Sequence, residues 1–130
     1  MKFLSNNGLQ YLITKLMGAD YIVEEGNANG WGYRKWNSGI AECWQHTSSE
    51  SLAMTTQAGN GYYTSKSNWN FPSGLFISAP TVIINTKAGS GLINACCNAV
   101  TKDSMNFFVY CTVAHTVGVE FMNYAIGNWK

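Results

Sequence analysis

From residue 20 onward, the chain consists of short segments rich in Val, Ile, Thr, Tyr, Phe and Trp. Clusters of Gly, Asn and Ser separate these segments. This pattern is typical of β-strands joined by turns. Strands at this spacing indicate an antiparallel sandwich or barrel, and we predict an all-β, jelly-roll-like antiparallel β-sandwich. The nine predicted strands are at residues 20–25, 31–36, 39–47, 51–57, 61–67, 76–85, 91–100, 105–114 and 117–129.

The segment before this region predicts one short helix. Residues 8–17 place apolar side chains at helical spacing, and Gly18 follows where a helix stop belongs. We therefore expect a helical segment at 1–19 and a β-sandwich over 20–130. An isolated helix of this length is marginal in water, so it must pack on its own domain or on a copy of itself. The candidate subunit-interface residues on this helix are Leu9, Leu12 and Leu16.

Residues 30–44 hold three of the five Trp residues, interleaved with charged residues. Two predicted arms, 31–36 and 39–47, pair through the turn-like triplet 37–39. Because side chains alternate along a strand, both faces of this hairpin carry aromatic and charged residues, which is unusual for a simple inside/outside sheet. Two interpretations stay open: neighbouring subunits cover both faces, or the Trp side chains fold under loops of one chain. The candidate subunit-interface residues here are Trp31, Tyr33 and Trp36.

Charge and hydropathy exclude several classes of partner. Charged residues make up only 12% of the chain and the formal net charge is +1, so nucleic-acid binding is not expected. The start of the chain shows no signal-peptide apolar region, and no apolar run approaches the ~18 residues that span a membrane. We expect a protein made and folded in a bacterial cytoplasm, with no membrane insertion and with its four Cys residues as buried, reduced thiols.

Residues that could carry catalysis or bind a metal are few. His46 and His115 are the only histidines, and neither has a spacing that supports zinc. A carboxylate pair for glycan cleavage would have to be assembled from distant segments, from Glu42, Asp103 or Glu120. We therefore predict no catalytic residue, no metal and no cofactor, and keep a glycan-cleaving enzyme as a rival hypothesis of a different class.

Two glycine-containing segments, 57–63 and 87–92, are predicted as hairpin loops, where a β-scaffold usually displays binding residues. Aromatic side chains near the first loop could offer flat apolar faces that suit sugar rings. Packing in the core or between subunits is the other interpretation of the same side chains. The candidate ligand-binding residues are Tyr62, Tyr63 and Trp69.

Three stretches of the chain, taken together, resemble a known family. They are "GWGYRKWNSGIAECW" at 30–44, "FPSGLFISAPTVIIN" at 71–85 and "NYAIGNWK" at 123–130. In this order they are similar to the C-terminal domains of bacteriophage tail-fibre and minor tail structural proteins, especially those from prophages of Gram-positive gut bacteria. The scaffold positions that the resemblance carries over are Trp44, Phe71, Pro72, Ile126 and Gly127.

The resemblance implies a non-enzymatic component of the virion tail. It would be a β-sandwich fibre tip, usually a homotrimer, that binds a bacterial cell-surface glycan or protein and associates with other tail proteins. For the aromatic hairpin, the resemblance favours subunit interface and core over a ligand platform. Two alternatives remain: a purely structural trimerisation domain of the tail, and a lone carbohydrate-binding module.

Overall fold

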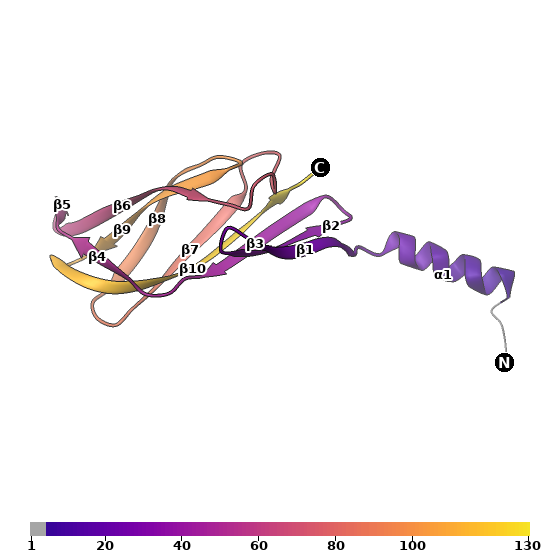
Figure 1. Cartoon of the computed structure of the whole chain (residues 1–130), viewed down its shortest axis with the longest axis horizontal. Helices are drawn as coiled ribbons and strands as arrows, with labels where there is room; N and C mark the ends of the chain where they lie inside the picture. The colour runs from indigo at the N-terminus through magenta and orange to yellow at the C-terminus, as the bar shows by residue number, and fades with distance from the viewer. Residues whose placement is uncertain (1–4) are drawn as a thin grey trace.

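A computed structural model describes residues 5–130 as two packed β-sheets with one helix projecting from an end of the sandwich (Figure 1). The predicted all-β antiparallel sandwich is confirmed. The elements are α1 (Asn6–Gly18), β1 (Ile22–Ala28), β2 (Trp31–Trp36), β3 (Ile40–His46), β4 (Glu50–Met54), β5 (Thr56–Ala58), β6 (Gly61–Asn70), β7 (Thr81–Ala88), β8 (Ile93–Val100), β9 (Ser104–Cys111) and β10 (His115–Asn128).

The two sheets have different sizes. The larger sheet has the order β1-β2-β3-β10-β4, with β7 paired to β10 as well, and the smaller sheet has the order β5-β6-β9-β8. All the pairings are antiparallel. The segment 51–57, predicted as one strand, is two: it changes sheets at Thr55, so that β4 pairs with β10 and β5 pairs with β6.

Strand β10 joins most of the larger sheet. Along one edge it pairs first with β4 and then with β3, and along the other edge it pairs with β7. Thr47 bridges the gap between β3 and β4, because its N–H donates to Phe121 O and its Oγ1 accepts from Phe121 N–H, both at 2.9 Å. The central strand therefore keeps its backbone groups paired where two strands meet on one edge.

The core lies between the sheets and follows the alternation of side chains along β9 and β10. Its centre is a cluster of aromatic rings in which Phe107, Phe121 and Trp69 pack at centroid distances of 5.2–5.4 Å. Trp31 and Phe76 both pack against Phe71, at 5.6 and 5.5 Å, and extend this cluster. These distances are typical of tilted and edge-to-face aromatic pairs, which add to the stabilisation from buried area.

The predicted hairpin of β2 and β3 is confirmed, and its turn ends at Gly39, whose φ of 100° suits glycine. Trp31 is 1% exposed, and its indole N–H donates to Asn70 O at 2.8 Å. This side chain, predicted to lie at a subunit interface, is thus buried within its own chain. Trp44 lies on the opposite, outer face, where its ring covers Gly32 and Arg34 stacks on it at 5.1 Å.

Helix α1 begins two residues earlier than expected because Ser5 caps it, with Oγ accepting from Gly8 N–H at 3.1 Å. In Figure 1 the helix stands apart from the sandwich, and it packs on no strand of the described chain. Its apolar residues Leu9, Leu12 and Leu16 are 47%, 43% and 61% exposed. Over residues 5–130, no helix has the length and hydropathy needed to cross a bilayer.

The four cysteines divide into two pairs. Cys43 and Cys111 are buried, and burial raises the pKa of the Cys43 thiol to about 12. Cys96 and Cys97 are exposed, so the prediction of buried thiols is wrong for them. The reason is topological, since both lie on β8, the edge strand of the smaller sheet.

Candidate functional site

The outer face of the smaller sheet carries an aromatic surface. Along β9, Met105, Phe107, Val109 and Cys111 are buried in the core. Because side chains alternate across a strand, Phe108 and Tyr110 point to the outer face.

These outward rings surround an apolar hollow of about 460 Å³. Tyr63 on β6 lies opposite Tyr110 in the ladder, and its ring meets the ring of Phe108 edge to face at 5.4 Å. Tyr63 is thereby held between two neighbours on β9. We call this surface the aromatic hollow; its lining residues are Ala58, Tyr63, Cys96, Phe108 and Tyr110.

Gly61 gives the hollow its shape. A Cβ at this position would come within 2.1 Å of the Tyr110 hydroxyl oxygen and 2.2 Å of the ring carbon that bears it. The phenol ring of Tyr110 can therefore occupy this position over β6 only because residue 61 has no side chain. Tyr110 is 37% exposed in this position.

The chemistry of the aromatic hollow is that of an apolar surface with a few polar groups. None of its lining residues is charged. The hydroxyls of Tyr63 and Tyr110 can each donate and accept a hydrogen bond, while the rings offer flat apolar faces. This combination suits a neutral ligand that has both apolar faces and hydroxyl groups.

The three predicted ligand-binding residues have different positions. Tyr63 lines the aromatic hollow. Tyr62 points the other way and packs against the core. Trp69 is part of the core cluster, and its indole N–H donates to Gln45 Oε1 at 2.8 Å. Sequence reasoning missed Phe108 and Tyr110, although the alternation in "MNFFVYC" carried the signal for them.

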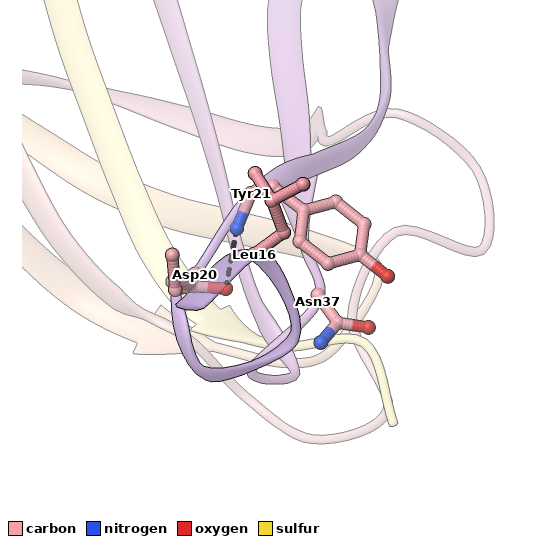
Figure 2. Close-up of a pocket in the computed structure, with 5 residues that line it drawn as sticks. Leu16, Asp20, Tyr21 and Asn37 are labelled. Carbon is pink, nitrogen blue, oxygen red and sulfur yellow. Dashed lines mark hydrogen bonds between the residues drawn. The ribbon is translucent and has the colours of Figure 1, made fainter. Parts of the chain in front are cut away.

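The predicted interface residues also separate. Tyr33 packs against the core and Trp36 is half-buried, whereas the leucines of α1 are open to solvent. At the C-terminal end of α1 an open hollow of about 760 Å³ lies between the helix and the β2–β3 turn (Figure 2). Its lining residues are Leu16, Ala19, Asp20, Tyr21 and Asn37.

Residues 19–21 are the neck that joins α1 to the sandwich. Asp20 Oδ1 accepts hydrogen bonds from the backbone N–H groups of Tyr21 and Ser38, at 3.0 and 2.9 Å. The hydrogen bond with Ser38 lowers the pKa of Asp20. Asn37 N–H donates to Tyr21 O at 2.8 Å, so the neck is tied to the β2–β3 turn.

The carboxylates considered for glycan cleavage do not come together. Glu42 accepts a hydrogen bond from the Tyr124 hydroxyl at 2.6 Å, and Glu120 accepts from Lys87 at 2.8 Å. Hydrogen bonding to Lys87, and then to His46, lowers the pKa of Glu120. Glu42 on β3 pairs with Ile126 of β10, which is six residues beyond Glu120. Six residues span roughly 20 Å along a strand, which exceeds the distance between the two carboxylates of a glycosidase.

The third carboxylate, Asp103, belongs to the turn between β8 and β9 in the other sheet. Within residues 5–130, no group of three or more His, Cys, Asp or Glu side chains is placed to hold a metal ion.

Comparison with known proteins agrees with the architecture. No protein-family model and no curated protein matches the sequence. An N-truncated R1-type pyocin tail fibre matches in structure with a TM-score of 0.64 and 14% identity, over 98% of this chain and 99% of that one. The fold is tail-fibre-like.

A second tail-fibre structure matches to the same degree. A C-terminal portion of the P. aeruginosa R1 pyocin fibre also gives a TM-score of 0.64 and 14% identity, with 96% of this chain and 32% of that chain covered. The chain thus corresponds to about a third of this longer fibre portion. At this identity, the similarity concerns the fold alone.

Proposed function

We propose that this protein is a non-enzymatic, homotrimeric tail-fibre component that attaches a phage-type tail to a bacterial cell-surface glycan or protein. The observation that supports this most is the similarity over nearly the whole chain to a pyocin tail fibre. Its place would be the virion tail, where it would associate with other tail proteins.

The exposed leucines of α1 support the trimeric state. A 13-residue helix is marginal in water on its own, and α1 packs on no strand of the described chain. Three copies that bury Leu9, Leu12 and Leu16 against one another would provide the missing packing. The hollow beside Tyr21 lies at the base of this helix and would be covered by the same association.

The aromatic hollow is the proposed receptor site. It lies on β5, β6, β8 and β9, and Figure 1 shows β5 at the end of the sandwich farthest from α1. A bundle of α1 helices would therefore leave this end free. Apolar rings with hydroxyl groups suit the faces and edges of a sugar, and three copies would bind a repeating surface polymer with avidity.

The proposal is tested by light scattering and by retention on bacterial cells. We expect a mass about three times 14.3 kDa, and retention that Phe108→Ser reduces at least tenfold. The matched control is Ile83→Ser, because Ile83 is 61% exposed on the larger sheet and does not line the aromatic hollow.

Three results would contradict the proposal in whole or in part. A strictly monomeric protein that is not retained on any cells would contradict both the trimeric state and the attachment role. A trimer that is never retained on cells or glycan arrays would favour a purely structural role in the tail, while a monomer that still binds sugars would favour a lone carbohydrate-binding module.

A further inference from the structure

A second hollow, lined by side-chain amides, lies away from the aromatic hollow. Two adjoining depressions of about 240 and 310 Å³ share Asn29 and Asn70, so they form one groove. One end of this amide groove is lined by Gln45 and Asn68, and the other end by Ser73 and Asp103. No residue of the amide groove lines the aromatic hollow.

The amide groove is held by two indole hydrogen bonds. Trp31 Nε1 donates to Asn70 O and Trp69 Nε1 donates to Gln45 Oε1, both at 2.8 Å. Asn29 Nδ2 also donates to Asn70 O, at 3.1 Å, which ties the β1–β2 turn to the end of β6. The wall of the groove is thus fixed by core tryptophans rather than by free loops.

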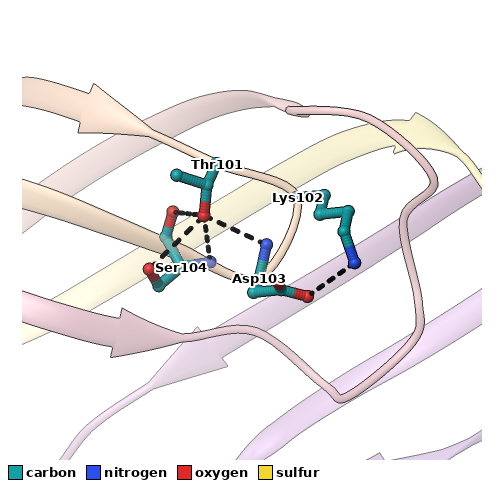
Figure 3. Close-up of polar contacts among 4 residues, drawn as sticks. All are labelled: Thr101, Lys102, Asp103 and Ser104. Carbon is teal, nitrogen blue, oxygen red and sulfur yellow. Dashed lines mark hydrogen bonds and ion pairs between the residues drawn. The ribbon is translucent and has the colours of Figure 1, made fainter.

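The end of the amide groove at Asp103 is formed by the turn at residues 101–104, which its own hydrogen bonds hold together (Figure 3). Thr101 Oγ1 accepts hydrogen bonds from the backbone N–H groups of Asp103 and Ser104, at 3.2 and 3.1 Å. Asp103 O accepts from Phe71 N–H at 2.9 Å, so this turn is joined to the loop that follows β6. Lys102 lies 3.4 Å from the Asp103 carboxylate and offsets its charge.

Several amide groups of the groove remain available. Within residues 5–130, three side-chain groups of the groove have no hydrogen-bond partner: Gln45 Nε2, Asn29 Oδ1 and the side-chain amide of Asn68. Each amide offers donors on one atom and an acceptor on the other. The groove therefore presents both hydrogen-bond donors and acceptors, and its one carboxylate, Asp103, is paired with Lys102.

We propose that the amide groove binds a neutral, hydroxyl-rich ligand, a saccharide unit, independently of the aromatic hollow. Each hydroxyl both donates and accepts, which matches an amide better than it matches a carboxylate or an ammonium group. A cation is a poor fit because Asp103, the one carboxylate of the groove, is already paired with Lys102. The proposal requires only the groove, so it stands even where the aromatic hollow binds nothing.

The test is a ¹H–¹⁵N NMR titration of the full chain with D-glucose, D-galactose and N-acetyl-D-glucosamine as probes. Each is added to about 50 mM, because a small site with few hydrogen bonds has a Kd near the millimolar range. The signals to follow are the indole N–H groups of Trp31 and Trp69 and the side-chain amides of Asn29 and Asn68. We expect saturable shifts of these signals with at least one sugar.

Variants decide whether the amides themselves bind. Asn29 and Asn68 both have φ of 55°, a conformation that glycine adopts without strain. Asn29→Gly with Asn68→Gly therefore suits the local backbone conformation, and it also removes the hydrogen bond from Asn29 to Asn70 O. We expect this pair to weaken sugar binding at least tenfold. The matched control Asn98→Gly removes an exposed amide of β8 that lines neither the groove nor the aromatic hollow, so it should bind sugar as the wild type does.

Three outcomes would overturn the inference. They are an absence of saturable shifts with all three sugars, equal binding by the double glycine variant, and shifts produced by a triglycine peptide but by no sugar. The last result would assign the groove to a peptide. Phe108→Ser tells the two sites apart. If it loses retention on cells while the groove signals still shift with sugar, the aromatic hollow and the amide groove bind separately. If the groove signals do not shift although retention on cells depends on Phe108, only the inference about the groove fails.

Discussion

Two glycines on the outer surfaces of the sandwich lie directly beneath aromatic rings, Gly32 beneath Trp44 and Gly61 beneath Tyr110. At each of them a Cβ would come closer than 3.0 Å to the ring, so the ring would have to move. Since Tyr110 is partly exposed, its ring can move toward solvent. This movement would change the shape of the aromatic hollow.

Gly61→Ala is therefore expected to destabilise the protein through Tyr110. The free energy of unfolding should fall by about 1 kcal/mol in the wild type and much less in a Tyr110→Ser background, a coupling that a double-mutant cycle measures in urea. Gly89→Ala is the control, because a Cβ there meets nothing within 4 Å. Equal costs in both backgrounds would mean that Tyr110 does not rest on Gly61.

Tyr124 provides a prediction about alkaline pH. Its hydrogen bond to the Glu42 carboxylate, together with burial, raises the pKa of Tyr124 from 10.0 to about 12. The unfolded chain loses this proton first, so the stabilisation is complete below pH 10 and is lost as the pH rises toward 12.

Between pH 9 and pH 11, urea unfolding should show a smaller loss of stability in Tyr124→Phe than in the wild type, by about 1 kcal/mol. An identical loss in both proteins would show that the pKa of Tyr124 is not raised in the folded state.

At the scale of elements, α1 is the helix that packs on no strand within residues 5–130, and the proposed trimer would cover it. Leu12→Glu with Leu16→Glu places charge on its exposed apolar face, and light scattering should show the trimer replaced by monomer. The thermal midpoint of the sandwich should stay unchanged, because α1 packs on no strand of the described chain. Gln10→Glu with Thr14→Glu is the control, and an unchanged mass in the leucine variant would exclude α1 as the association element.

The hairpin of β2 and β3 could be predicted from the sequence because local signals define it, a turn triplet between two alternating arms. The start of β7 could not: residues 76–80 were predicted as strand, yet β7 begins at Thr81. Phe71, Leu75 and Phe76 are each 2% exposed, so this stretch is a loop that fills the core. Tertiary packing overrode a local preference for strand there.

At the scale of the whole molecule, the proposed function depends on three sites acting together. Linked sites gain about 10²-fold or more in avidity over one site, so the monomeric Leu12→Glu with Leu16→Glu variant should lose at least that factor in retention on host cells. Its affinity for a soluble monovalent sugar should be unchanged. A loss of monovalent binding as well would mean that the substitutions damage the site itself.

The aromatic hollow and the amide groove were only partly predictable because each is made of residues from distant segments. Tyr63 was predicted beside a glycine-containing loop, but its partners Phe108 and Tyr110 come from β9, more than forty positions later. Gln45 and Asn68 meet only because β3 and β6 lie in facing sheets. Spacing within a segment cannot show such meetings, whereas sheet topology can.

The order of synthesis gives β10 a special role. It is the last of the ten strands that the structure describes over residues 5–130, yet it is the strand that pairs with β3, β4 and β7. A nascent chain that ends before residue 115 therefore exposes the unpaired edges of those three strands. The larger sheet can close only after translation has passed this point, and a chain interrupted earlier would be left with open strand edges that favour aggregation.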